Sequence, residues 1–416
     1  MKITINDIAK IEHAEVMIQG ISVLTGYNAT GKSTVSKALN AIISAYTDVL
    51  QSAECSRLQS MRTALYGLMN KILSDRPYFI LGDNLQLFLQ EAQTKESRFP
   101  EDYEKFRELA ARLDDNEELP EATSEINVEY RSFLEKSRTI QERPIGDYIR
   151  FVIERSILSA FDNQINTIGQ TSLGRIVLSS NNGDMNCEVF FKGNRLQSCS
   201  YKRIKVPKPI YVKSKHSLDD LPTDGKARQH SSKIDPILSD LLDHNEDYAE
   251  WRTIEVHEKL DRILALIDEA IRGGLVENGE SLQYMNEHSS PISLKNLASG
   301  NKTFAMIKRL LENGQLCKDR ILIIDEPETN LHPKWQLILA NILVILYKEL
   351  GLKVFLNSHS PYFVRAVEVY TKRYDIMDRC FFYRTVQGKN GLYRVEDVTK
   401  ETEKIYRTLY FPLEGL

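Results

Sequence analysis

Short apolar runs at the start of the chain predict β-strands. Residues 1–25 divide into two or three such runs, and Ile21–Thr25 is the segment that we expect to be most deeply buried. The segment after Gly31 predicts a helix over Thr34–Ser44. Residues 35–165 are then mostly polar and helical in pattern, so a long helical region follows the first strands.

The pattern changes near residue 171. Residues 171–213 are rich in Val, Ile, Phe and Tyr and are broken by Asn-Asn-Gly and Gly-Asn turns, which predicts strands. Residues 217–280 return to helical spacing, with a helix over 251–274 that ends at Gly-Gly. From residue 292 helix and strand alternate, and a Gly-Lys-Asn-Gly turn joins the last two strands ahead of a final helix. This alternation predicts an α/β fold.

Composition narrows the class of protein. With 416 residues the chain is long enough for two or three domains, and its net charge of −4 excludes a surface that is basic throughout. The longest apolar run, Leu337–Tyr347, is well short of the roughly 20 residues that cross a bilayer. The start of the chain has the pattern of a strand and lacks that of a secretory signal. Five scattered cysteines, with no C-x-x-C pair, argue against zinc ribbons and disulfide frames, so we expect a cytoplasmic protein.

The strongest chemical signal is a phosphate-binding loop. Gly26–Ser33 matches G-x-x-x-x-G-K-S at every fixed position, between an apolar strand and a helix. Glycines allow backbone N–H groups to surround phosphates, and the helix N-terminus adds positive potential. We expect Lys32 to reach the β- and γ-phosphates and Ser33 to bind Mg²⁺. The residues expected to bind nucleotide here are Gly26, Asn28, Ala29, Thr30, Gly31, Lys32, Ser33 and Thr34.

A second signal lies almost 300 residues later. The apolar run Ile321–Ile324 is followed by Asp325 and Glu326. We expect the buried strand to place Asp325 as a magnesium ligand and Glu326 as the general base for water. An apolar run that ends in Asp-Glu is a weak motif alone, and it gains its meaning from the phosphate loop.

The third signal is His359 in the segment 357–361, after the strand LKVFL. A histidine after a strand has a structural interpretation as well as a functional one. A helix predicted over Pro333–Leu350 separates this strand from that of Asp325, so both strands should be parallel and end at one edge of the sheet. That position favours His359 as a sensor of the γ-phosphate and a third catalytic residue beside Lys32 and Glu326.

Taken in order, these segments resemble an ABC-type ATPase head. The resemblance is carried by the phosphate loop, Leu297–Lys302, the string DEPETNLHP (325–333) and NSHSP (357–361). It is closest to the soluble branch that contains SMC proteins and the ATPase domains of OLD-family nucleases, as an AAA-family ATPase without a Toprim domain. Similar ATPases are subunits of anti-phage systems such as Septu and PARIS. The resemblance covers residues 1–34 and 292–365.

The resemblance implies a P-loop NTPase head with a mixed sheet, an antiparallel β-subdomain and large helical insertions. The head would comprise residues 1–50, 170–216 and 285–416, with helical insertions at 51–169 and 217–284. ATP and Mg²⁺ are the implied cofactors. The family's Gln-containing loop has no direct counterpart, because no glutamine follows the strand at 209–214 directly.

Such heads pair head-to-tail, with each nucleotide between one chain's phosphate loop and the other chain's signature segment. The resemblance places Ser299 and Gly300 against the partner's γ-phosphate, and Asn330–His332 at the dimer interface. Ala298 stands where the family has serine, so Ser299 is the candidate to replace that hydroxyl. Without the resemblance, Ser299 would be interpreted as the N-cap of a helix.

Two charged segments leave alternatives open. Residues 192–215 contain eight Lys or Arg residues and no acid, with aromatic residues nearby; they favour either nucleic-acid contact or protection of strand edges. Glu101–Glu129 contains eleven acidic residues and three basic ones, which indicates a solvated helical face or an acidic docking surface.

The leading hypothesis is an ATP-hydrolysing switch that closes as a head-to-tail dimer and controls a partner effector in anti-phage defence. We expect the effector to be a nuclease on a separate polypeptide, since the residues after 365 leave no room for a Toprim domain. One alternative is a DNA-binding ATPase of the repair or chromosome type. Another is an ATP-bound scaffold that holds and inhibits a toxic effector with little turnover.

Overall fold

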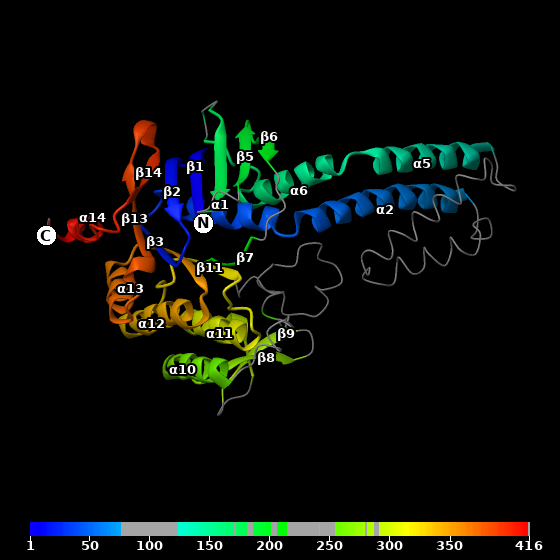
Figure 1. Ribbon diagram of the computed structural model, residues 1–416. Helices are drawn as coiled ribbons and strands as arrows, with labels where there is room; N and C mark the ends of the chain where they lie inside the picture. The colour runs from blue at the N-terminus through cyan, green and yellow to red at the C-terminus, as the bar shows by residue number, and fades with distance from the viewer. Residues whose placement is uncertain are drawn as a thin grey trace. The chain divides into compact units, whose positions relative to one another are not determined.

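The computed structural model describes residues 1–75, 124–167, 169, 172–180, 186–200, 206–213, 241, 254–278, 281–286 and 291–414. They form two compact units, whose elements are drawn in Figure 1. The larger unit comprises Met1–Thr47 and Ser156–Leu416, and the helical unit comprises Asp48–Arg155. The phosphate loop, the segment of Asp325 and Glu326, and the segment of His359 all lie in the larger unit.

The larger unit is built on a mixed sheet with the strand order β6-β5-β4-β1-β2-β14-β13-β3-β12-β11-β7 among the described residues. Five neighbouring strands are parallel: β7 (Lys208–Val212), β11 (Arg320–Asp325), β12 (Lys353–Ser358), β3 (Ile21–Thr25) and β13 (Cys380–Gln387). The register pairs Asp325 with Asn357, and Ser358 with Thr25. The carboxyl ends of β3, β11 and β12 therefore meet at one edge of the sheet.

The other half of the sheet is mainly antiparallel. It contains β1 (Lys2–Ile8), β2 (Ile11–Met17), β4 (Gly174–Ser179), β5 (Asn186–Lys192) and β6 (Arg195–Ser200). The strand β14 (Tyr393–Asp397) joins the halves, because it pairs antiparallel with β13 and parallel with β2. A parallel core with an antiparallel subdomain is the ABC-type P-loop NTPase fold, as the sequence predicted.

Helices cover both faces of the parallel strands. Alternate side chains such as Val23, Ile324 and Leu356 share one apolar cluster with the helices α10 to α13. Their strand neighbours face the other way, toward α1 (Lys32–Tyr46), which packs on β7, β11 and β12. The remaining helices around this core are α10 (Ile254–Ala270), α11 (Ser299–Glu312), α12 (Pro333–Leu350), α13 (Pro361–Arg373) and α14 (Glu403–Glu414).

Local sequence explains where α12 and α13 begin. Each has proline at its first turn, where no backbone donor is lost. The His332 ring accepts from the backbone N–H of Lys334, and Ser360 Oγ accepts from that of Phe363, so each helix has a side-chain cap. Gly351, with φ of 68°, ends α12. Both site loops at the ends of β11 and β12 thus lead into well-defined helices.

A smaller sheet lies beside α11. It is ordered β10-β9-β8, with β8 (Gly274–Asn278), β9 (Ser281–Met285) and β10 (Ile292–Ser293) all antiparallel. Short 3-10 turns follow at η1 (Leu294–Asn296), η2 (Met377–Arg379) and η3 (Lys389–Gly391). The helix predicted to end at Gly-Gly ends earlier, at Ala270, because Gly274 already belongs to β8.

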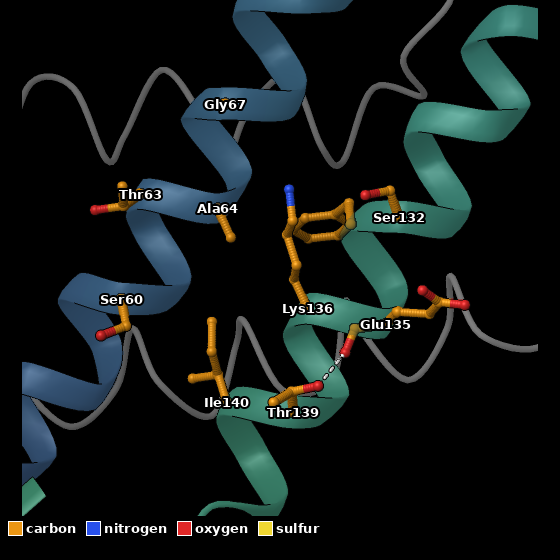
Figure 2. Close-up of a pocket in the computed structure, with 10 residues that line it drawn as sticks. Ser60, Thr63, Ala64, Gly67, Ser132, Glu135, Lys136, Thr139 and Ile140 are labelled. Atoms are coloured by element: carbon orange, nitrogen blue, oxygen red, sulfur yellow. Dashed lines mark hydrogen bonds between the residues drawn. The ribbon is translucent and has the colours of Figure 1, made fainter.

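The helical unit contains α2 (Val49–Asp75), α5 (Ser124–Glu142) and most of α6 (Ile145–Ala160). The helices α2 and α5 pack side by side, a pairing that the sequence did not predict. Between them lies a groove of about 560 Å³, and Figure 2 shows Lys136 and Ile140 of α5 beside it. None of the described helices has the length and apolarity of a membrane span.

Candidate nucleotide site

The phosphate loop has a backbone that requires glycine at two points. Gly26 and Gly31 have φ of 150° and 93°, a region in which side chains are strained. A Cβ on Gly26 would also overlap Thr385 Oγ1, and one on Gly31 would lie 2.6 Å from Ile11 Cδ1. The loop is therefore pressed against β13 on one side and β2 on the other.

Hydrogen bonds from several elements fix the loop. Thr385 Oγ1 of β13 donates to Thr30 Oγ1 at 2.8 Å, and Thr30 in turn donates to the Tyr27 carbonyl at 2.8 Å. The Tyr27 hydroxyl donates to the carbonyl of Thr408 on α14 at 2.5 Å, while the Tyr27 side chain stays 44% exposed. Contacts to β13 and α14 thus hold the loop backbone in place. Asn28, Ala29 and Ser33 are exposed to solvent.

Lys32 is buried within the loop that it follows. Its Nζ donates to the carbonyls of Gly26 and Tyr27 at 2.8 and 2.7 Å. Burial lowers the pKa of this ammonium group, and the carboxylates of Glu326, Glu328 and Asp325 oppose that shift. The lysine therefore lies in the field of the acids that follow β11, even though almost 300 positions separate them in the sequence.

Asp325 accepts hydrogen bonds from three side chains. Its Oδ1 accepts from Ser36 Oγ at 2.5 Å and from Asn357 Nδ2 at 2.6 Å, and its Oδ2 accepts from the Tyr211 hydroxyl at 2.7 Å. Asn357 also donates to Ser36. The pKa of Tyr211 is raised by burial and then by the charge of Asp325. Three elements, α1, β12 and β7, thus hold one carboxylate in place.

Glu326 has the strained backbone that is common at functional sites. Its φ is 50°, and its N–H donates to the carbonyl of Asn357 at 2.8 Å. This conformation turns the side chain out of the strand, where 27% of it is exposed. His359 Nδ1 lies 3.6 Å from Glu326 Oε1, so the two predicted catalytic groups are neighbours.

A further carboxylate, Glu328, lies behind this pair. Its Oε1 accepts from Ser358 Oγ at 2.7 Å and from the backbone N–H groups of His359 and Ser360 at 3.0 and 3.1 Å. Burial raises the pKa of Glu328, against hydrogen bonds from Ser358 and His359 that lower it. This residue joins the loop after β11 to the loop after β12.

The site contains buried polar atoms that the described residues leave unsatisfied. Asn357 Oδ1, Glu328 Oε2 and His359 Nδ1 are buried and have no hydrogen-bond partner within the described structure. Such atoms in a polar site are normally satisfied by a ligand or water. Magnesium in such sites takes one or two protein ligands besides phosphate and water, which fits Ser33 and Asp325.

The predicted signature residues lie elsewhere in the larger unit. The helix α11 begins at Ser299, with Ala298 in the N-cap position and no side-chain cap, so the N-cap interpretation of Ser299 is wrong. Gly300 packs against the loop after β11: a Cβ there would lie 3.0 Å from Leu331 Cδ2 and 3.3 Å from the Asn330 carbonyl. The start of α11 therefore packs directly against the loop that contains Asn330 and Leu331.

The charged segments are only partly described. Lys192 and Arg195 flank the turn between β5 and β6, and Lys208 begins β7; β6 and β7 are the outer strands of the described sheet. Positions 202, 203, 205 and 215 lie outside the described residues, as do 101–123 of the acidic segment. Nucleic-acid contact through 192–215 stays a prediction.

Four residues of the site were not predicted from the sequence. Glu328 and Asn357 lie inside the strings DEPETNLHP and NSHSP, so their positions in these motifs could have indicated them. Ser36 lies one helical turn after Lys32, on the same face of α1. Tyr211 had no such signal, because only the sheet order brings β7 next to β11.

Comparison with known proteins gives a family match. The family model described as "AAA domain, putative AbiEii toxin, Type IV TA system" matches residues 21–365, which include the loop, strand and histidine motifs. No curated protein matches the sequence.

Among solved structures, the SMC head domain from Thermotoga maritima is 10% identical, with a TM-score of 0.38 over 95% of this chain and 98% of that chain. An SMC head bound to the C-winged helix domain of ScpA is 9% identical, with a TM-score of 0.40 over 97% and 98%. An SMC head with a coiled coil and joint from Pyrococcus yayanosii is 9% identical, with a TM-score of 0.38 over 99% of each chain.

Proposed function

Because this chain belongs to the family of AAA domains described as a putative AbiEii toxin of a type IV toxin–antitoxin system, whose members are ATPases, we propose that it binds ATP with Mg²⁺ and hydrolyses it. The observation that carries the proposal is the convergence of Lys32 with Asp325, Glu326 and His359 at the carboxyl ends of β3, β11 and β12.

Each residue has a role that follows from its surroundings. When nucleotide binds, Lys32 Nζ donates to the phosphates in place of the carbonyls of Gly26 and Tyr27. The positive charge of the ammonium group then faces the nucleotide. Ser33 and Asp325 would hold Mg²⁺, which would supply positive charge beside the phosphate oxygens. Glu326 directly follows β11, is partly exposed and lies beside His359. It accepts the proton of the attacking water.

We further propose that ATP closes a head-to-tail homodimer. In this arrangement Ser299 and Gly300 of one copy contact the γ-phosphate bound by the other copy. Support comes from the packing of Gly300 on Leu331, because it couples the signature helix to the loop that follows the catalytic strand. The γ-phosphate is then the contact that differs between the closed and open states.

The closed state is proposed to control a separate effector, a nuclease, in bacterial anti-phage defence in the cytoplasm. The family description, which names a putative toxin of a type IV toxin–antitoxin system, supports a link to a toxic activity. The proposed head comprises residues 1–50, 170–216 and 285–416. The two proposed insertions, 51–169 and 217–284, would transmit its state to the effector.

The test is ATP turnover by the purified chain with Mg²⁺, compared with Lys32→Ala and Asp325→Asn. We expect turnover by the natural chain and its loss in both variants. Absence of turnover, with ATP co-purifying, would favour the ATP-bound scaffold instead. Stimulation of turnover by DNA at low salt would favour the DNA-binding alternative.

A further inference from the structure

The Glu328 side chain is buried, with 3% exposed, and three donors converge on one of its oxygens. They are Ser358 Oγ and the backbone N–H groups of His359 and Ser360. These donors belong to the loop after β12, whereas Glu328 belongs to the loop after β11. One carboxylate oxygen therefore fixes the two catalytic loops to each other.

The His359 ring lies between two acids. Its Nδ1 is 3.5 Å from Glu328 Oε1 and 3.6 Å from Glu326 Oε1. Nδ1 has no hydrogen-bond partner in the described part of the chain, but two carboxylates face it, so the favoured tautomer carries its proton on that nitrogen. Nε2 on the other side of the ring then remains free to contact phosphate.

A comparison with a second buried glutamate, Glu368, shows that Glu328 differs in its ion-pair partners. Glu368 on α13 is equally buried, but Lys372 Nζ and Arg365 Nη1 lie 2.6 and 2.8 Å from its oxygens. Within the described residues, Glu328 has no Lys or Arg at ion-pair distance, and the His359 ring lies beside it. A neutral glutamine would accept the same three hydrogen bonds, and an uncompensated buried charge destabilises a fold. The carboxyl of Glu328 differs from such a glutamine in the acidic group that it presents to the imidazole.

We propose that Glu328 is a positioning residue that holds His359 beside Glu326 and fixes the imidazole proton on Nδ1. This inference rests on the proposed function, since it assigns Glu328 to the same hydrolysis step. Glu328 acts through His359 and does not touch the nucleotide. Its charge, more than its hydrogen bonds to the backbone, is what the catalytic step uses.

The experiment is a double-mutant cycle in ATP turnover with Glu328→Gln, His359→Ala and the double variant. Glu328→Gln keeps an acceptor for the three donors and removes the charge. We expect it to lower kcat by about tenfold with KM changed less than twofold, the lower end of the loss that follows removal of a carboxylate that orients a metal-bound histidine. In the His359→Ala background, Glu328→Gln should lower kcat no further.

The matched control is Glu368→Gln, an equally buried glutamate away from the site. It should lower the melting temperature and leave kcat unchanged. Additive losses in the cycle, or unchanged kcat in Glu328→Gln, would overturn the positioning role while turnover by the natural chain upholds the proposed function. If the natural chain has no turnover, the proposed function itself fails, and the positioning role fails with it.

Discussion

Ser36 Oγ, on the first helix, donates a hydrogen bond of 2.5 Å to Oδ1 of Asp325, which lies at the end of β11. Both residues are buried, and Asn357 of β12 donates to the same oxygen. This bond joins the helix of the phosphate loop to the strand of the proposed magnesium ligand. Hydrogen bonds within the protein therefore hold this part of the proposed ATP site together.

Replacing Asp325 by Asn should remove the charge that holds Mg²⁺ while keeping the shape of the side chain. We expect kcat to fall by about 100-fold or more, because such a metal supplies several kcal/mol of charge stabilisation. Ser36→Ala is the matched change on the other side of the bond and should cost about 1–2 kcal/mol of stability. Turnover measured over a range of Mg²⁺ concentrations separates loss of the metal ligand in Asp325→Asn from loss of stability in Ser36→Ala. A natural Mg²⁺ dependence in Asp325→Asn would contradict the metal assignment.

Glu326→Gln should trap the closed dimer, because ATP binds but water is no longer deprotonated. Turnover should fall by about 100-fold or more. Light scattering with ATP and Mg²⁺ should show a dimer that the natural chain forms only transiently. Glu349→Gln, a change on α12 away from the site, serves as the control. Turnover at the natural rate in Glu326→Gln would show that another residue is the base.

Thr385→Val keeps the volume of the side chain but removes the hydrogen bond from β13 to the phosphate loop. Loss of one such bond, about 1 kcal/mol, should weaken ATP binding about fivefold. Titration with a fluorescent ATP analogue measures this change. Thr371→Val removes an equally buried hydroxyl on α13 and should leave the affinity unchanged. Equal losses in both variants would mean that the effect is one of general stability.

Gly300→Ala tests the proposed contact in the dimer. The new methyl group would lie 3.0 Å from Leu331 Cδ2, so the signature helix or the interface loop must shift. We expect ATP-dependent dimerisation in the Glu326→Gln background to weaken, with ATP affinity of the monomer unchanged. Gly274→Ala is the control, because a Cβ there meets nothing nearer than 3.7 Å. A comparable loss of monomer affinity would argue against a role in the partner's site.

The network around Glu368 should make stability depend on acid pH. Burial opposes ionisation of this carboxyl, but hydrogen bonds from Lys372, Tyr406 and Arg365 outweigh it and lower its pKa below the ordinary 4.5. A group whose pKa is lowered on folding stabilises the protein above its ordinary pKa, and this stabilisation is lost as the pH falls through the folded value. Melting temperature should therefore fall below about pH 4.5. Glu368→Gln should show a weaker fall, and an identical fall would contradict this assignment.

Several parts of the site were predictable because their signals are local. The loop Gly26–Ser33 needs glycine at positive φ and a lysine after it, and these requirements leave a fixed spacing in the sequence. The strand before Asp325 is an apolar run, and the structure confirms that β11 is buried from Ile321 onward. The parallel pairing of this strand with the one before His359 is confirmed too, since a helix between two strands favours that connection.

The sequence by itself determined which residues carry charge and which segment forms a backbone of the phosphate-loop type, because both depend on residues adjacent in the chain. The tertiary structure decided what each acid faces. Only the sheet order brings Tyr211 to hydrogen-bond distance of Asp325, Thr385 to that of the phosphate loop, and Glu328 to that of the loop containing His359. These contacts depend on which strands are neighbours, and pairing between distant segments leaves no periodic mark in either segment.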